Sequence, residues 1–250
     1  MRYNLYLTKQ QSLATPRDAM YAVNIGLTTN SIVVDTHGHM MIMFMKQALP
    51  ERLIAQLETT SRICAQRVTS RHLKGGGSKE RGDHLNVRFG CTIMRGGTGE
   101  ICVSVCNREL SDMISNNMQL WRHISDLFQQ HMPEEAAVVR CIPEQLRVFG
   151  LFSLGFWNIT NISKLHRDAR DWRWCVVIAF GEFEQGLLDF PHINVTVDCK
   201  RCDVCFFWSK KVFHNLERIV GSRQSFVLTN HTAVLRRFTD QGDAQQYNHV

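Results

Sequence analysis

A series of short strand-like runs in the C-terminal part of the chain constrains the fold more than any other feature. From about residue 140, CVVIAFG, GLLDF, INVTV, DVCFFW and SFVLTNH follow one another with turn residues between them. Many short runs rich in β-branched and aromatic residues, without helical periodicity, are typical of a sandwich, barrel or jelly roll. We therefore predict a β-core over residues 141–238 and a tail at 239–250.

Two amphipathic helices are predicted before this core. Apolar residues recur at helical spacing in LPERLIAQLETTSRICAQRV, where Pro50 marks the start, and again in SDMISNNMQLWRHISDLFQQHM. Ser111 is the expected N-cap of the second helix, and Pro133 is expected to end it. The apolar residues of the first helix are Leu53, Ile54, Leu57, Ile63 and Val68.

Between the two helices the sequence predicts a loop and a hairpin. Residues 70–88, SRHLKGGGSKERGDHLNVR, contain three consecutive glycines and a surplus of three positive charges, so we predict a long mobile basic loop. RFGCTIM and EICVSVC are expected to form short strands around a GGTG turn. These patterns predict one α+β domain over residues 1–250, in which a helical and strand layer at 1–140 packs against the β-core.

The composition is that of an ordinary globular protein. Hydrophobic residues make up 44% of the 250-residue chain, and no apolar run reaches the length of about 18 residues that a membrane span needs. The nine cysteines are widely spread and no secretory signal is evident, so we expect an intracellular protein of the nucleus or cytoplasm with free, mostly buried thiols. The net charge of +6 permits an anionic partner such as nucleic acid.

The segment KLHRDARDW carries the sharpest chemical signal. His166 and Asp168 are two residues apart, so on an extended strand an imidazole and a carboxylate would face the same side and could grip one cation. His214, 46 residues beyond Asp168, can supply a third ligand from a neighbouring strand. Two histidines and one carboxylate on one side of a metal form the facial triad of non-haem Fe(II) oxygenases.

A second motif follows in GSRQS. Arg223 lies nine residues after His214, and Ser225 lies two residues further along the same predicted strand. A guanidinium and a hydroxyl on one face can hold a carboxylate by charge-assisted hydrogen bonds. A dicarboxylic keto acid needs both motifs, because one end chelates the metal and the other end must be held at a distance.

With these residues in place, the chain resembles a known family. Residues from about 150 to 238 resemble the double-stranded β-helix core of the 2-oxoglutarate and Fe(II)-dependent dioxygenases, through H-x-D, the run ending in QGLLDFP, the turn before DVCFFWS, the distal histidine and G-x-R-x-S. Within that superfamily the sequence pattern is most similar to that of the TET/JBP-like group, which oxidises thymine or 5-methylcytosine in nucleic acid. The second aspartate after H-R-D and the run WCVVIAFGEFEQGLLDFP suggest this group.

The resemblance implies roles for individual residues and a set of cosubstrates. Arg223, helped by Ser225, would hold the distal carboxylate of 2-oxoglutarate, and Asn158 would be a further cosubstrate contact. The implied reaction consumes O2 and 2-oxoglutarate, releases succinate and CO2 and hydroxylates a C–H bond, with ascorbate supporting activity. The implied Fe(II) ligands are His166, Asp168 and His214.

Three interpretations of the function remain open from the sequence. The first is oxidation of a 5-methylpyrimidine base in nucleic acid, with the basic loop at 70–88 clamping phosphates. The second is the same chemistry on a protein side chain or a small molecule. The third is a catalytically inactive β-helix that serves as a binding module, and the complete His-Asp-His-Arg set argues against it.

Other polar and aromatic residues allow two interpretations each. His231 either contacts substrate or is a structural histidine at a strand end, and Arg170 and Asp171 either line the pocket entrance or form a solvated turn. The DTHGHMM segment is expected to be a turn without a ligand role. The tryptophans of the β-region either pack in the core or stack on a flipped base. They are Trp172, Trp174 and Trp208.

Three cysteines in VTVDCKRCDVCFFWS stand at three-residue intervals. Cys199 is expected to end one strand, Cys202 to lie in a turn where relatives often have glycine, and Cys205 to lie in the next strand, with Phe207 on its face. Structural zinc requires four converging ligands, so we predict no metal here. A second departure from the family is Gln185, followed by glycine, where relatives often have two glycines.

Overall fold

The computed structural model describes six segments of the chain. Most of the predicted basic loop, at 70–84, lies outside them, as do Val68, the GGTG turn and the last eleven residues, 240–250. The described residues are 2–4, 25–67, 85–93, 101–104, 108–159 and 162–239.

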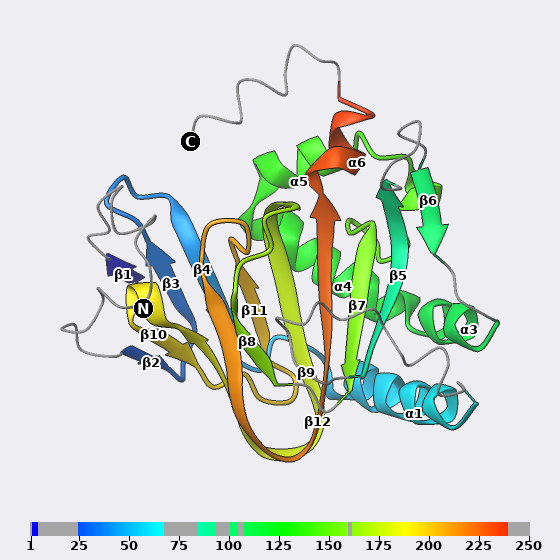
Figure 1. Cartoon of the computed structure of the whole chain (residues 1–250), viewed down its shortest axis with the longest axis horizontal. Helices are drawn as coiled ribbons and strands as arrows, with labels where there is room; N and C mark the ends of the chain where they lie inside the picture. The colour runs from blue at the N-terminus through cyan, green and yellow to red at the C-terminus, as the bar shows by residue number, and fades with distance from the viewer. Residues whose placement is uncertain are drawn as a thin grey trace.

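Two long antiparallel strands run through the fold. β9 (Asp171–Phe190) and β12 (His214–His231) pair with each other along most of their length and bend together at the lower edge of the molecule in Figure 1. Gly181 and Gly221 lie at this bend with left-handed backbone, at φ 97° and 101°. A Cβ on either glycine would collide with the opposite strand's backbone, so the paired bend requires glycine at both positions.

The bend divides these strands between two sheets. The first half of β9 and the second half of β12 belong to a large sheet of order β1-β3-β4-β11-β9-β12-β7-β5-β6. The other halves pair with β10 and β8, and β10 also pairs with β2, which makes a smaller second sheet. The other strands are β1 (Arg2–Asn4), β2 (Ile25–Leu27), β3 (Ser31–Val34), β4 (Met40–Met45), β5 (Leu85–Ile93), β6 (Ile101–Ser104), β7 (Leu154–Ile159), β8 (Ser163–His166), β10 (Val195–Val197) and β11 (Val204–Phe207).

The alternation of side chains explains why β9 is so continuously apolar. Cys175 and Val177 belong to a core cluster built from both sheets, whereas Val176 and Ile178 belong to a cluster shared with the helices. Both faces of this part of the strand are therefore buried, and a strand buried on both faces has no solvent-facing position for polar residues. This arrangement confirms the predicted double-stranded β-helix core with helices packed against it.

Helices cover the face of the large sheet that points away from the small sheet (Figure 1). Trp121 and Phe128 of the helical layer pack against sheet residues such as Phe206 and Phe226. No helix in the described segments is long and apolar enough to cross a membrane. The helices are α1 (Glu51–Arg67), α3 (Arg108–Asn116), α4 (Met118–His131), α5 (Pro133–Val139) and α6 (Thr232–Arg236), with short 3-10 turns η2 (Glu144–Leu146) and η3 (Pro191–Ile193).

The first predicted helix is confirmed as α1, with one error in its apolar face. Ile63 is 44% exposed, and the neighbouring Cys64 is buried in its place. The residues Leu53, Ile54 and Leu57 are buried as expected. The error arises because position 64, not 63, continues the helical repeat of about 3.6 residues from Leu57.

The second predicted helix is wrong in its continuity and its start. The helix breaks at Asn117 into α3 and α4, and α3 begins at Arg108, so Ser111 lies inside a helix and is not its cap. The Asn117 side chain donates hydrogen bonds to the Met113 carbonyl (2.7 Å) and to Thr60 of α1 (2.8 Å), which ties the break to the neighbouring helix. Such a tertiary contact leaves no local sequence signal.

The ends of the predicted regions also differ from the structure. α4 ends just before Pro133 as expected, but this proline also opens α5, where its missing N–H costs nothing. The short helix α6 lies inside the region predicted as β-core. The predicted strand pair after the basic loop is confirmed as β5 and β6, which pair antiparallel. The three tryptophans of the β-region are at most 9% exposed, which supports the core interpretation.

Replacing Gly221 by alanine is expected to destabilise the fold strongly. The new Cβ would lie 2.5 Å from the Glu182 carbonyl oxygen on left-handed backbone. We expect the free energy of unfolding, measured by urea titration, to fall by about 2–4 kcal/mol. Gly38→Ala is the matched control, because Gly38 is also left-handed but has open space around its Cβ, and it should cost only about 1 kcal/mol. Equal losses in the two variants would contradict the clash argument.

Candidate metal centre and cosubstrate pocket

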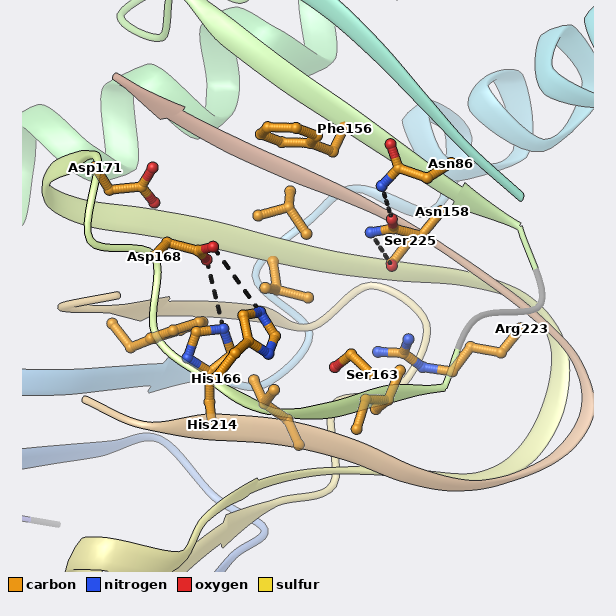
Figure 2. Close-up of a pocket in the computed structure, with 15 residues that line it drawn as sticks. Asn86, Phe156, Asn158, Ser163, His166, Asp168, Asp171, His214, Arg223 and Ser225 are labelled. Carbon is orange, nitrogen blue, oxygen red and sulfur yellow. Dashed lines mark hydrogen bonds and ion pairs between the residues drawn. The ribbon is translucent and has the colours of Figure 1, made fainter. Parts of the chain in front are cut away.

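A pocket between the two sheets gathers polar side chains from strands that are far apart in the sequence (Figure 2). It contains about 730 Å³ of space, counted out to its open mouth. Apolar residues such as Val177, Leu188 and Phe207 line its middle. The polar lining residues are Asn86, Asn158, Ser163, His166, Asp168, Asp171, His214, Arg223 and Ser225.

Three of these residues can share one metal ion. Ligand atoms of His166, Asp168 and His214 all lie within 4.8 Å of one another. The two Asp168 oxygens are 3.9 Å from Nε2 of His166 and 3.5 Å from Nε2 of His214. Among the described residues this is the one His/Cys/Asp/Glu group with such spacing. The structure thus brings together the three residues that the sequence singled out.

The two histidines are held in the tautomer that metal binding requires. Nδ1 of His166 lies 2.7 Å from the carbonyl oxygen of Lys164, and Nδ1 of His214 lies 3.1 Å from that of Val212. A carbonyl oxygen only accepts hydrogen bonds, so each Nδ1 carries the proton and each Nε2 keeps a lone pair. Both lone pairs belong to the atoms nearest Asp168, so the donor set fits a divalent metal such as Fe(II).

Asp168 reaches this position in a different way from the one predicted. β8 ends at His166, so Asp168 lies in the following turn and not on the same strand face. Its backbone N–H donates a 3.0 Å hydrogen bond to the carbonyl of Ser209, which fixes the turn against the segment after β11. His166 and Asp168 therefore converge because of a tertiary contact. The prediction that they share a strand face named the right residues but not the structural reason.

Arg223 is a buried cation that forms no ion pair with a described side chain, although the Asp198 carboxylate acts on it from a distance. It is 3% exposed, its Nε has no hydrogen-bond partner in the described part of the chain, and its guanidinium lies over the ring of Phe183 at 5.5 Å. Burial lowers the pKa of Arg223, but a guanidinium stays charged at neutral pH. A buried charge without a counter-charge is costly, so this end of the pocket suits a carboxylate ligand.

Gly186 makes room for this arginine. A Cβ at position 186 would lie 2.6 Å from Cδ and 2.8 Å from Nε of Arg223. Gln185 stands where relatives often have the first of two glycines, but Gly186, the glycine that touches the arginine, is retained. The departure from the family pattern at this turn therefore leaves the arginine's site intact.

A chain of polar side chains runs beside the arginine. Asn86 on β5 donates to the side-chain Oδ1 of Asn158 (2.6 Å), and the Asn158 side-chain amide donates to Ser225 Oγ at 3.4 Å. Asn158 and Ser225 are register partners on β7 and β12, and both line the pocket. Asn86 and Ser163 were missed, because single polar residues on strands carry no motif.

Asp171 lies at the other end of the pocket from Arg223 (Figure 2), whereas its neighbour His231 is not among the residues that line the pocket. Asp171 is 3% exposed, so it is not part of a solvated turn, and its Oδ2 accepts a 2.6 Å hydrogen bond from Ser209. His231 Nε2 lies 3.8 Å from Asp171 Oδ1. Burial, with Arg88 nearby, lowers the pKa of His231 to about 4, so this imidazole is neutral at physiological pH.

Several other predicted residues are not brought into the pocket. Arg170 is exposed, is not among the lining residues and contributes a backbone carbonyl that accepts from Thr232. The DTHGHMM segment forms the expected turn between β3 and β4, in which Asp35 accepts hydrogen bonds from the backbone N–H groups of His37 and His39.

The three spaced cysteines do not converge. Cys199 and Cys205 belong to the core cluster between the sheets, whereas Cys202 belongs to the cluster under the helices. Burial raises the pKa of Cys199 and Cys202 to about 12, which leaves both as neutral thiols and poor metal ligands. Cys202 lies in the turn at φ 70°, the left-handed conformation that explains glycine in relatives. All seven cysteines whose side chains are described are free, and six are buried.

Comparisons with known proteins agree with this architecture. No family model and no curated protein matches the chain. Among solved structures, NgTET1 in complex with 5mC DNA matches with a TM-score of 0.67 at 17% identity, over 96% of this chain and 98% of that one. A 2OG-Fe(II) oxygenase family oxidoreductase from Burkholderia pseudomallei matches with a TM-score of 0.51 at 11% identity, over 83% and 95% of the chains.

A Pseudomonas putida prolyl-4-hydroxylase is also similar, with a TM-score of 0.48 at 14% identity over 76% of this chain and 91% of that one. The first two matches show that the chain has the fold of 2-oxoglutarate/Fe(II) oxygenases, with a TET protein among the similar structures. The resemblance stated for residues 150–238 is confirmed at the level of the fold.

Metal binding is expected to depend on the three converging residues. His214→Ala should weaken Co²⁺ binding, followed by visible absorption, by more than about 100-fold, the upper range for losing a group that only orients a ligand. His39→Ala is the matched control: His39 pairs with Asp35 at 3.1 Å, but no third ligand joins them among the described residues. An equal loss in both variants would show that the Co²⁺ site lies elsewhere.

Proposed function

We propose that this protein is an Fe(II)- and 2-oxoglutarate-dependent dioxygenase that oxidises a 5-methylpyrimidine base, 5-methylcytosine or thymine, in nucleic acid. The observation that carries the proposal is a His-Asp-His ligand set in the same pocket as a buried arginine that forms no ion pair with a described side chain. Each feature alone has other uses. Together they match a metal-chelating molecule with a second carboxylate.

In this proposal His166, Asp168 and His214 hold Fe(II) through two Nε2 atoms and a carboxylate oxygen. Three ligands on one side leave the opposite positions open. When bound, the iron supplies the activation of O2 that couples decarboxylation of 2-oxoglutarate to succinate with hydroxylation of a C–H bond. The apolar middle of the pocket, with Val177 and Phe207, keeps water away from the reacting atoms.

Arg223 holds the distal carboxylate of 2-oxoglutarate, and Ser225 adds a hydrogen bond from its hydroxyl. Arg223 and Ser225 are both buried, at 3% and 4% exposure, so the carboxylate would replace water around a charge that forms no ion pair with a described side chain. Asn158, held by Asn86, orients the Ser225 hydroxyl and forms the side wall of the cosubstrate site.

Asp171 contacts the substrate base at the other end of the pocket, with His231 next to it. Its Oδ2 accepts from Ser209 and its Oδ1 lies 3.8 Å from Nε2 of His231, so the carboxylate would accept from an exocyclic amino group beside this imidazole. A neutral imidazole suits the uncharged edge of a pyrimidine better than a cation does. The fold shared with NgTET1 in complex with 5mC DNA supports this class of substrate. Arg170, exposed at the mouth, would meet the strand outside the pocket.

The decisive experiment follows succinate in the presence of Fe(II), O2, ascorbate and 2-oxoglutarate, with and without 5-methylcytosine DNA or RNA. We expect succinate formation to rise with methylated nucleic acid, and 5-methylcytosine to be lost in step. His166→Ala should abolish both signals. Absence of succinate under every condition would refute the dioxygenase. Succinate formation that no nucleic acid stimulates would refute the base substrate and favour a protein side chain or a small molecule.

Gly186→Ala is expected to impair the cosubstrate site and spare the metal site. The added methyl group pushes Arg223 from its position, so the KM for 2-oxoglutarate should rise by about 10-fold or more, as for a displaced charge-assisted contact. Arg223→Ala should raise it further.

Gly26→Ala is the control for this substitution, because its Cβ would be in ordinary contact at 3.9 Å. Co²⁺ binding should be unchanged in all of these variants. Loss of metal binding parallel to the rise in KM would contradict the separate roles of the two ends.

A further inference from the structure

Four basic residues lie together beside the Asp171 end of the pocket, and we call them the rim cluster. Ser209, which donates to Asp171 and accepts from the Asp168 backbone, directly precedes two of them. Helix α6, which starts right after His231, contains another. The rim cluster consists of Arg173, Lys210, Lys211 and Arg236.

A bulge in β9 positions the arginine of this cluster. Between the pairs Thr229↔Cys175 and His231↔Asp171, a single residue of β12 faces three residues of β9. Arg173 lies in this bulge with left-handed backbone, at φ 57°. Bulges of this kind redirect a side chain out of the regular alternation, and a non-glycine residue accepts such backbone only where its surroundings hold it.

The buried ring of Trp208 is the common platform of the cluster. The Arg173 guanidinium lies 5.4 Å from the ring centre, and Lys211 Nζ lies 4.0 Å from it. Both cations are therefore held against the protein by cation–π contact. Trp208 is 6% exposed, so the ring that these two cations contact is itself buried.

Positive charge is in excess at the rim cluster. Arg173 is paired with Glu135 at 3.3 Å, and Asp35 acts on Lys211 from a distance. Neither Lys210 nor Lys211 has a carboxylate within ion-pair distance among the described residues. Burial, together with Arg236 and Arg173, lowers the pKa of Lys210.

Lys211 shows the same effect, because burial, together with Arg173 and Lys210, lowers its pKa against the opposing effect of Asp35. Like charges packed this closely are stabilised when an anion binds among them.

We propose that the rim cluster binds the phosphodiester backbone of the nucleic-acid strand whose base enters the pocket. The inference rests on the proposed function, because it assigns a surface to the same substrate. Phosphate contacts fix the register of a strand without reading its sequence, and a cluster beside the substrate end can hold the strand while one base turns inward. The residues of the rim cluster are all described and lie outside the basic segment 70–88 of the sequence.

The test compares two charge-matched variants. Lys210→Gln/Lys211→Gln removes two charges from the rim cluster, whereas Arg62→Gln/Arg122→Gln removes two from exposed positions on α1 and α4. Binding to a short fluorescent DNA duplex, with and without a central 5-methylcytosine, is measured by anisotropy over a series of salt concentrations. Thermal unfolding checks that each variant is folded, and Arg236→Gln, at an exposed position, repeats the test if the double lysine variant is unstable.

We expect the rim variant to bind both duplexes at least about 10-fold more weakly, with the slope of log K against log salt reduced by about 1.8, since each lost phosphate contact changes it by about 0.9. The control variant should match the wild-type protein in slope. If wild-type protein binds DNA and the rim and control variants behave alike, the phosphate-binding role of the rim cluster is refuted and the proposed function stands. If wild-type protein turns over 2-oxoglutarate but binds no nucleic acid, the proposed substrate and the rim cluster both fail.

Discussion

The paired bend of β9 and β12 is the constraint on which the rest of the structure depends. Two adjacent strands leave one sheet and enter the other together, and left-handed glycines, Gly181 and Gly221, permit this without breaking their hydrogen-bond ladder. The bend closes one end of the space between the sheets. Because β12 crosses from sheet to sheet, it delivers His214 from the small sheet and Arg223 from the large one to the same pocket.

The buried Arg223 makes the two ends of the pocket electrostatically different. A guanidinium that is 3% exposed and forms no ion pair with a described side chain carries a desolvation cost that an anionic ligand would offset. The opposite end has Asp171, whose carboxylate accepts from the Ser209 hydroxyl. The proposed dianionic cosubstrate would therefore be favoured at the arginine end and disfavoured at the Asp171 end. In the same proposal the rim cluster would hold the polyanionic strand outside the pocket, so charge alone would separate the two substrates.

The sequence predicted those parts of the site whose chemistry is written in short motifs. H-x-D and G-x-R-x-S named four residues that the structure brings into one pocket, and the β-rich texture predicted the core. Asn86, Ser163 and Ser209 were missed, because each acts through a contact with a residue distant in the chain. The break at Asn117 was missed for the same reason. A sequence pattern shows only the periodicity of neighbouring residues. The roles of these residues depend on contacts with partners far away in the chain, which periodicity does not reveal.

The side-chain alternation of a regular strand would have placed the metal-ligating histidine and the arginine of β12 on different faces. Counted along β12, Arg223 and Ser225 share a face, and His214, at an even position, would point to the other one. The pairing with β9 is irregular here: β12 gains one residue between Glu217 and Val220 and loses it again between Val220 and Gly221. A regular strand with the same residue types would have put the histidine and the arginine on opposite faces of the sheet, yet both line the pocket. The residue types were thus readable from the sequence, but their convergence depends on the irregular bend of the packed pair of strands.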